Sequence, residues 1–158
     1  MSWRRYAASA EDTRAAGEAF ASLLRPGDVV LLSGPLGAGK TAFTQGVGRG
    51  LGVHERVTSP TFTIVRQHAC RNDLGITTLH HADVYRVGSL GEVDDLALGE
   101  LVEESAVAVV EWGEIASSLF GRAVINVSFS VDENEGRTIE VDGALAGRDL
   151  QLGEWAAP

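Results

Sequence analysis

Apolar residues along this chain alternate between helical spacing and short continuous runs. In residues 9–24 (SAEDTRAAGEAFASLL) the apolar side chains recur on one helical face, and Ser9 with Asp12 three residues later fits a capping box. Continuous apolar runs follow at 29–33 (VVLLS) and 106–112 (AVAVVEW), which have the length of strands. Such uninterrupted strands favour a parallel sheet that is covered on both faces.

The remaining segments continue this alternation of strands and helices. The expected elements are a helix in 41–51 despite its glycines, strands in 61–67 and 76–81 around a turn at 71–73, an acidic helical section in 90–104, and a hairpin of 122–131 and 137–143. We therefore predict one α/β domain over residues 1–158, of the P-loop NTPase type. Its sheet has a parallel core, added antiparallel strands and helices on both faces. The tail from Ala144 is expected to be loosely held.

The charge of the chain narrows the class of partner. Its 158 residues include 13 Lys and Arg against 22 Asp and Glu, a net charge of −9 and a sequence pI near 4.8. This balance disfavours tight, unaided binding of nucleic acid, which requires clustered basic side chains. A single cysteine excludes an intrachain disulfide, and no apolar run is long enough for a signal sequence or a membrane span. We expect a cytoplasmic protein with no membrane contact.

Residues 34–41, GPLGAGKT, contain the only lysine of the chain. The segment follows a predicted buried strand, precedes a predicted helix, and fits G-x-x-x-x-G-K-[ST] with Gly34, Gly39, Lys40 and Thr41 in register. Glycines let backbone N–H groups surround phosphate oxygens, and the helix N-terminus adds further donors. Lys40 suits the β- and γ-phosphates, and the Thr41 hydroxyl suits Mg²⁺. The sequence predicts a nucleotide-phosphate site.

Two acidic residues lie where predicted strands end. Glu111 closes the apolar run 107–110, and Asp83 follows the strand expected in 76–81. Ligands of open α/β sheets bind at this edge, so either carboxylate could serve Mg²⁺ or orient an attacking water. A solvated carboxylate at a strand end is the alternative for Glu111. A guanine-reading N-K-x-D motif is excluded because Lys40 is the only lysine, and this favours ATP.

Two further stretches, TSPTF (58–62) and HHADVYR (80–86), are ambiguous on their own. The first is a Pro-containing loop that, after a P-loop helix, could order around a γ-phosphate. In the second, His80 and His81 are neighbours on a predicted strand, so they point to opposite faces and cannot bind one metal together. We interpret both histidines as ordinary strand residues.

The motifs GPLGAGKT, TSPTF, HADVYR and EWGE, in this order and spacing, resemble the TsaE family over residues 9–142. That family comprises small bacterial P-loop ATPases required for making threonylcarbamoyladenosine in tRNA. The resemblance implies an ATPase that uses ATP and Mg²⁺ and works with two partner proteins, TsaB and TsaD. TsaD transfers the threonylcarbamoyl group to tRNA, so tRNA would be reached indirectly, through the complex.

The resemblance also implies roles for single residues. The residues that would wrap the phosphates are Gly37, Ala38, Gly39, Lys40, Thr41 and Ala42. Thr41 and Glu111 would serve Mg²⁺, and Asp83 would be an active-site acid. Ala42 departs from a family that often has a hydroxyl residue there, which removes a side-chain hydrogen bond but leaves the backbone N–H.

The other implied site residues lie outside the P-loop. Thr61 would belong to a switch-like loop, and Trp112 would pack near the nucleotide. Glu11, at the start of the first helix, would lie near the adenine. Arg137, in an N-E-G-R stretch before the last strand, is a weaker candidate for a nucleotide contact.

Two other functions share the P-loop. A small-molecule or nucleotide kinase would need an arginine-bearing lid, but Arg66, Arg71 and Arg86 are scattered. A nucleotide-sensing module without turnover would not need the acids Asp83 and Glu111. The acidic stretch within 92–104 fits a solvated helical face, or a docking surface for a basic partner.

Overall fold

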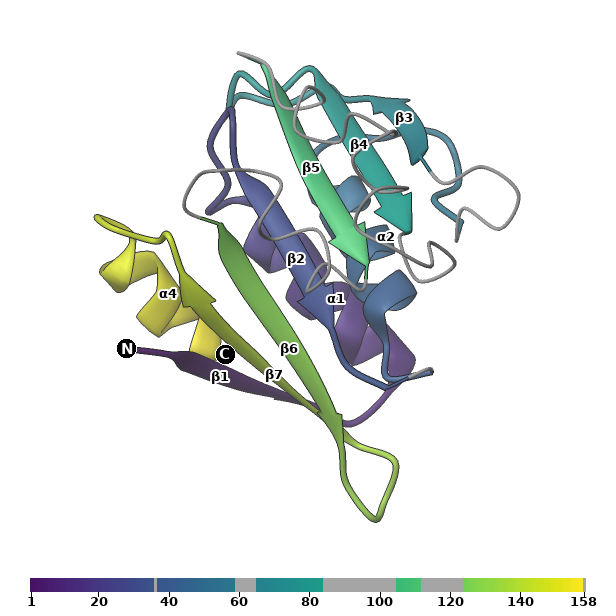
Figure 1. Cartoon of the computed structure of the whole chain (residues 1–158), viewed down its shortest axis with the longest axis vertical. Helices are drawn as coiled ribbons and strands as arrows, with labels where there is room; N and C mark the ends of the chain where they lie inside the picture. Colours follow the sequence, from purple (N-terminus) through teal and green to yellow (C-terminus); the bar gives the residue numbers. More distant parts are fainter. Residues whose placement is uncertain (36, 59–64, 84–104, 112–123, 158) are drawn as a thin grey trace, which may run out of the picture.

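The computed structural model describes residues 1–35, 37–58, 65–83, 105–111 and 124–157. Their strands form one seven-stranded sheet in the order β1-β7-β6-β2-β5-β4-β3 (Figure 1). The strands are β1 (Trp3–Ala7), β2 (Val29–Ser33), β3 (Val65–Ala69), β4 (Thr78–Asp83), β5 (Ala106–Glu111), β6 (Ile125–Val131) and β7 (Arg137–Gly143). The helices are α1 (Ala10–Ala21), α2 (Lys40–Gly50) and α4 (Asp149–Ala156).

The centre of the sheet is parallel and its margins are antiparallel. β2 pairs in parallel with both β5 and β6, and β4 pairs in parallel with β5. At the margins β3 is antiparallel to β4, β7 to β6, and β1 to β7. The predicted mixed α/β sheet, with a parallel core and antiparallel additions, is confirmed.

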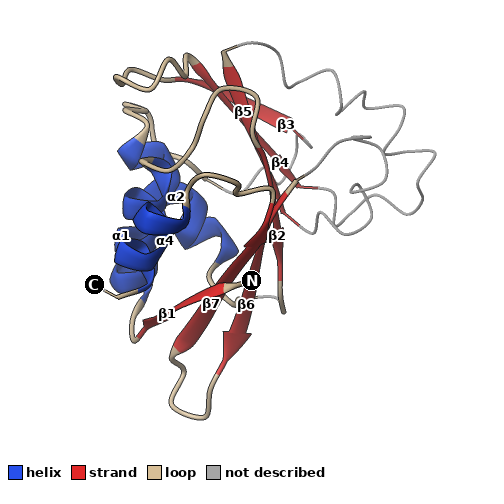
Figure 2. Ribbon diagram, turned by 90° about the vertical axis from the view of Figure 1, so that its left-hand side faces the viewer, coloured by secondary structure: helices blue, strands red, loops and turns tan. Residues whose placement is uncertain are grey.

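The continuous apolar runs form the central strands, as predicted. Every residue of β5 is buried, as are the first four of β2, whereas β1 and β3 at the two edges are only partly buried. The described helices lie together on one side of the sheet (Figure 2). Helices expected on the other side fall outside the described residues. Among the described residues, no helix is both long and apolar enough to cross a membrane.

The boundaries of two strands differ from the prediction. β4 continues two residues beyond the expected 76–81, so Asp83 is the last residue of the strand. β3 is described from Val65 and continues to Ala69, and the expected positions 61–64 lie outside the described residues. The hairpin of β6 and β7 is confirmed.

Helices α1 and α2 pack with their backbones in contact at glycines. A Cβ on Gly17 would lie 2.1 Å from the Phe43 carbonyl oxygen, and a Cβ on Gly46 would lie 2.0 Å from the Arg14 carbonyl oxygen. No side chain fits at these distances, so glycine is required there. The glycines that weaken the helical signal of 40–50 are therefore the residues that bring the two helices together.

Aromatic rings extend this contact across the core. Phe20 of α1 and Phe43 of α2 have ring centroids 5.4 Å apart, and Phe43 stands edge-on to Phe129 of β6 at 5.5 Å. Trp155 of α4 lies 6.1 Å from Phe20. These tilted and edge-on arrangements are the favoured ones for aromatic pairs. One line of rings therefore connects all three described helices to the sheet.

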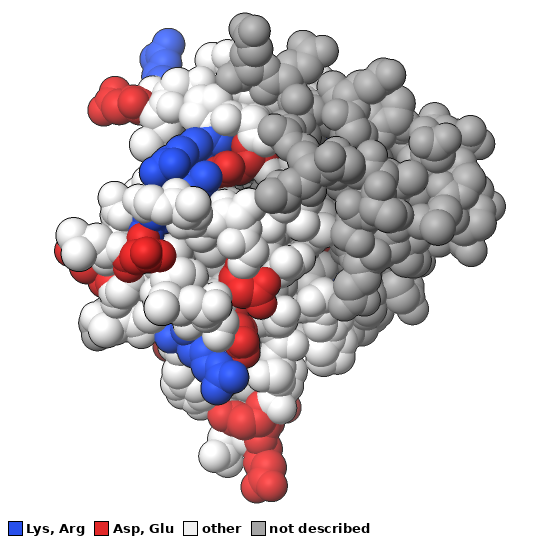
Figure 3. Space-filling view, turned by 60° about the vertical axis from the view of Figure 1, so that its left-hand side comes forward, with Lys and Arg blue, Asp and Glu red and all other residues white. Residues whose placement is uncertain are grey.

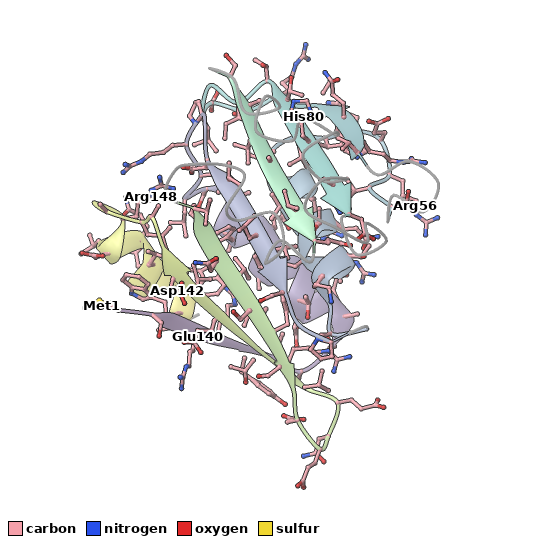
Figure 4. The ribbon with its side chains drawn as sticks, in the orientation of Figure 1. Met1, Arg56, His80, Glu140, Asp142 and Arg148 are labelled. Atoms are coloured by element: carbon pink, nitrogen blue, oxygen red, sulfur yellow. The ribbon has the colours of Figure 1, made fainter. Side chains whose placement is uncertain are left out.

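The expectation of a loosely held tail from Ala144 is wrong for the described residues. Residues 149–156 form α4, whose Leu152 and Trp155 are buried, and Trp155 Nε1 donates to the Ala16 carbonyl at 2.9 Å. Arg148, just before α4, donates through both terminal nitrogens to Asp28, at 2.6 and 3.0 Å (Figure 4). The apolar pattern of this segment is too short to predict a helix. The helix forms because its apolar side chains pack against α1.

The edge strand β1 was also not predicted. The segment WRRYA has two consecutive arginines and no apolar run, yet it pairs along its length with β7. Arg4 donates to Glu140 at 3.0 Å on the exposed side, and Arg5 donates to the Trp155 carbonyl at 3.1 Å. Polar side chains on an edge strand keep it soluble and protect it from pairing with other chains.

We expect Trp155→Ala to lower the free energy of unfolding by roughly 3 to 5 kcal/mol, because it removes a buried ring and the hydrogen bond to Ala16. Urea denaturation followed by circular dichroism measures the change. Leu150→Ala, on the same helix but 80% exposed, serves as control and should change it by less than about 0.5 kcal/mol. Equal effects of the two variants would mean that α4 is not docked in solution.

Candidate nucleotide and metal site

The glycine-rich segment joins the end of β2 to the start of α2, the context that the sequence predicts. Gly37 and Gly39 have φ angles of 76° and 106°, in the left-handed region that side chains disfavour. Among the described residues, a Cβ on Gly37 would meet nothing within 4 Å, whereas one on Gly39 would lie 3.2 Å from Thr13 Cγ2. Within this part of the chain, the loop is therefore closely packed against α1 at Gly39 but not at Gly37.

The N-termini of α1 and α2 differ in their capping residues and in the charge of their first turns. In α1 the Ser9 hydroxyl accepts a hydrogen bond from the Asp12 N–H at 3.1 Å, and acidic residues occupy the first turn. In α2 the capping residue is Gly39, with no side-chain hydrogen bond and no acidic residue in the first turn. The first N–H groups of a helix need an external acceptor. The α2 terminus is thus left available to an anion.

Lys40 is buried at the first position of α2, and its side chain turns back over the loop. Its Nζ donates to the carbonyl oxygens of Gly34 at 2.7 Å and Pro35 at 3.0 Å. The single lysine charge therefore lies at the loop itself.

A carboxylate from β5 meets the next residue of α2. The Thr41 hydroxyl donates to Glu111 Oε1 at 3.1 Å, although the two residues are 70 positions apart in the chain. Glu111 is 3% exposed. Asp83 ends the neighbouring strand β4 and is the direct register partner of Glu111. The ends of β4 and β5 therefore bring both predicted acids to the edge where α2 begins.

The oxygen atoms of Thr41 and Glu111 suit Mg²⁺, which prefers hydroxyl, carboxylate and water ligands. No group of three His, Cys, Asp or Glu side chains that could hold a metal occurs among the described residues. Mg²⁺ in nucleotide sites is usually bound by one or two protein ligands, together with phosphate oxygens and waters. The residues present fit that kind of site.

Arg137 reaches the loop from the start of β7. Its Nη2 donates to the Gly37 carbonyl at 3.1 Å, and its Nη1 donates to the Glu135 carbonyl. The turn before it is held by Asp132, which accepts from the backbone N–H groups of Gly136 and Asn134, each at 2.8 Å. These two bonds lower the pKa of Asp132 below its ordinary value. Arg137, the weaker of the candidates for a nucleotide contact, therefore lies beside the glycine-rich loop.

Glu11 lies in the first turn of α1 and pairs with arginines. Its carboxylate accepts from Arg49 at 3.1 Å and from Arg14 at 3.4 Å, and the Arg49 bond is the main cause of its lowered pKa. The residue of α1 that contacts the loop is Thr13, buried against Gly39. The adenine contact expected of Glu11 stays a prediction.

Some predicted residues fall outside the described part of the chain. They are Thr61, Trp112 and the acidic stretch within 92–104. Ala38 is buried in the loop, and Ala42 is half-buried in the first turn of α2.

Comparison with known proteins identifies the family. The family model described as threonylcarbamoyl adenosine biosynthesis protein TsaE matches residues 7–139. This chain belongs to the TsaE family. It is therefore a protein of tRNA threonylcarbamoyladenosine biosynthesis, in agreement with the resemblance found in its motifs.

Individual TsaE proteins are similar over most of the chain. The protein of Treponema pallidum is 41% identical over 133 residues, which cover 84% of this chain and 95% of that protein. The protein of Bacillus subtilis is 43% identical over 115 residues, covering 73% and 68%. The crystal structure of Bacillus subtilis YdiB superimposes with a TM-score of 0.74 at 29% identity, covering 98% of this chain and 94% of that one.

Two residues of the site were not selected from the sequence of this TsaE-family chain. Thr13 carries no motif, and only the packing of α1 on α2 brings it to Gly39. His81 was interpreted as an ordinary strand residue, yet its Nε2 lies 3.2 Å from Glu111 Oε1. The sequence did contain a signal for His81, because His81 and Asp83 are two positions apart on one strand and therefore share a face.

Because Gly37 and Gly39 differ in their surroundings, substituting alanine at each should lower the free energy of unfolding by a different amount. We expect Gly37→Ala to lower the free energy of unfolding by about 1 kcal/mol, from backbone conformation alone. Gly39→Ala should cost about 1 to 3 kcal/mol more, because the new Cβ presses on Thr13 Cγ2. Urea denaturation without nucleotide measures both.

Thr13→Ser provides the control, since it removes that methyl group and keeps the hydroxyl. In the Gly39→Ala background it should recover most of the excess cost, after correction for Thr13→Ser alone. If Gly37→Ala lowers the free energy of unfolding as much as Gly39→Ala does, then contact with Thr13 does not determine which side chains position 39 tolerates.

Proposed function

We propose that this chain is an ATPase that binds ATP with Mg²⁺ and acts as a nucleotide-driven switch on TsaB and TsaD partner proteins. Its membership of a tRNA threonylcarbamoyladenosine biosynthesis family sets the pathway. The observation that carries the proposal is the contact of Thr41 Oγ1 with Glu111 Oε1 at an uncapped helix N-terminus. Together these groups offer two magnesium ligands next to a phosphate site.

Phosphate binding is assigned to the loop and the first turn of α2. The backbone N–H groups of 37–42 would surround the phosphate oxygens, helped by the positive end of the helix dipole. Lys40 would neutralise negative charge on the β- and γ-phosphates. Arg137, already beside Gly37, is the candidate for a further contact from the sheet.

Hydrolysis is assigned to the acids at the ends of β4 and β5. Bound Mg²⁺ would neutralise charge that develops on the phosphate oxygens. Thr41 and Glu111 would hold that ion, and Asp83 or Glu111 would orient the attacking water by accepting its hydrogen bond. The direct register of Asp83 with Glu111 supports a shared site for these roles.

The switch would work through the loop that contains Thr58 and Thr61. Gln45, one turn along α2 from Thr41, donates through Nε2 to the Val57 carbonyl at 2.9 Å. The residue just before TSPTF is therefore attached to the helix that begins at the phosphate site. A loop that orders on ATP would change the affinity for partners, and coupling of roughly 1 to 3 kcal/mol is typical.

The charge of the chain supports indirect rather than direct engagement of tRNA. The net charge is −9, and on the face shown in Figure 3 basic side chains are interspersed with acidic ones. A protein that grips a phosphate backbone by itself presents clustered Lys and Arg. We therefore assign tRNA contact to the partners, within a cytoplasmic complex.

Phosphate release from ATP by the purified chain, alone and with TsaB and TsaD, tests the proposal. Release should be slow alone and rise with the pair. Lys40→Ala should lower it about a hundredfold or more, because the charge at the phosphate site is lost. Arg4→Ala is the matched control, since it removes one exposed positive charge on β1 and should leave the rate unchanged.

Each contrary outcome has a defined meaning. ATP binding without phosphate release under any condition would make the chain a nucleotide sensor. Fast turnover that requires a small-molecule acceptor would make it a kinase. Turnover that persists in Lys40→Ala would place the nucleotide elsewhere on the chain.

A further inference from the structure

We propose that His81 is a positioning residue that holds the Glu111 carboxylate in place for the metal. This inference rests on the proposed function, since it assigns a role toward the magnesium site. His81 would act as a hydrogen-bond donor to Glu111 and would not itself be a ligand.

The strand register brings His81 to the site. His81 lies on β4 opposite Val109 of β5, and Asp83 lies opposite Glu111. Side chains two positions apart on a strand share a face, so the imidazole points to the same side of the sheet as Asp83 and Glu111. His81 is fully buried beneath that edge.

One carboxylate oxygen lies between His81 and the P-loop helix. Glu111 Oε1 is 3.2 Å from His81 Nε2 and 3.1 Å from Thr41 Oγ1. The same atom thus contacts both the hydroxyl assigned to Mg²⁺ and a buried imidazole.

Among the described residues, Glu111 is the one polar group recorded within hydrogen-bond distance of the His81 imidazole. Neither ring nitrogen of His81 completes a hydrogen bond within the described part of the chain, although Nε2 is already within hydrogen-bond distance of Glu111. A buried polar group without a hydrogen-bond partner lowers stability, and a hydrogen bond from His81 to the Glu111 carboxylate would relieve that cost.

His68 shows what a buried histidine does away from the site. It lies on the neighbouring strand β3, shares a face with Leu79 by register, and its Nδ1 is 2.6 Å from Glu55 Oε1. Both histidines are nearly inaccessible and each faces one glutamate, but only the glutamate of His81 contacts Thr41. His68 is therefore the matched control for loss of a buried imidazole.

Residues that hydrogen-bond to a metal's carboxylate ligand fix its orientation, and losing them typically weakens metal binding by about 10- to 100-fold. The test is an Mg²⁺ titration of the binding of a fluorescent ATP analogue. Glutamine places its amide nitrogen near the Nε2 position, whereas asparagine reaches only the Nδ1 position. We expect His81→Asn to weaken the apparent Mg²⁺ affinity about tenfold, and His81→Gln to retain it.

Three controls separate positioning from folding. Nucleotide binding without Mg²⁺ should be unchanged in both His81 variants, and His68→Asn should leave the Mg²⁺ dependence intact. In a Glu111→Gln background, His81→Asn should have no further effect on Mg²⁺ affinity. If His81→Asn does not fold, His81→Leu takes its place, since it leaves no polar atom buried.

The proposal is overturned if His81→Asn and His81→Gln show the same Mg²⁺ affinity, or if His68→Asn loses as much as His81→Asn. Failure of the unsubstituted chain to bind the ATP analogue would instead overturn the proposed function. Normal, Mg²⁺-dependent binding that is indifferent to residue 81 would overturn only the role of His81.

Discussion

The structure depends on backbone contact between α1 and α2. Gly17 and Gly46 each leave no room for a side chain, so the two helix axes approach as closely as their main chains allow. This approach brings Thr13 against Gly39, where α2 begins, and fixes the loop from one side. A larger side chain at either glycine would push α2 away from α1, and would displace Lys40 and Thr41 at its start. The geometry of the proposed phosphate site is therefore a consequence of helix packing as much as of its own motif.

The sheet supplies the other half of the site. Because β4 and β5 run parallel to β2, their carboxyl ends meet at the edge where the loop leaves β2, and this is where Asp83 and Glu111 lie. The burial of Glu111 is tolerated because Thr41 donates to it. A negative charge in this position opposes a bare polyphosphate, so a cation is expected to strengthen phosphate binding at the neighbouring helix end. Under the proposed function, the arrangement would couple nucleotide binding to metal binding by electrostatics.

Sequence was informative where local chemistry decides structure. The P-loop, the apolar strands and the hairpin follow from patterns of a few residues, and so does the position of Glu111 at a strand end. Sequence was not informative where structure depends on packing between residues that are far apart in the chain. Strand β1 has no apolar pattern and exists because β7 has a free edge, and α4 forms because its Trp155 covers α1. The contacts of Thr13 and His81 depend on register and on helix approach, which no local pattern encodes.

The order of strands has a consequence for synthesis of the chain on the ribosome. β2 and the loop that follows it emerge early, but both neighbours of β2 in the sheet, β5 and β6, are made much later. Until then Val30 lacks its register partners Val109 and Ile125, and Glu111 has not yet joined Thr41. A nascent chain therefore carries a complete phosphate-binding motif without a complete site. Under the proposed function, a nucleotide would meet all of these groups only after β5 and β6 have been synthesised.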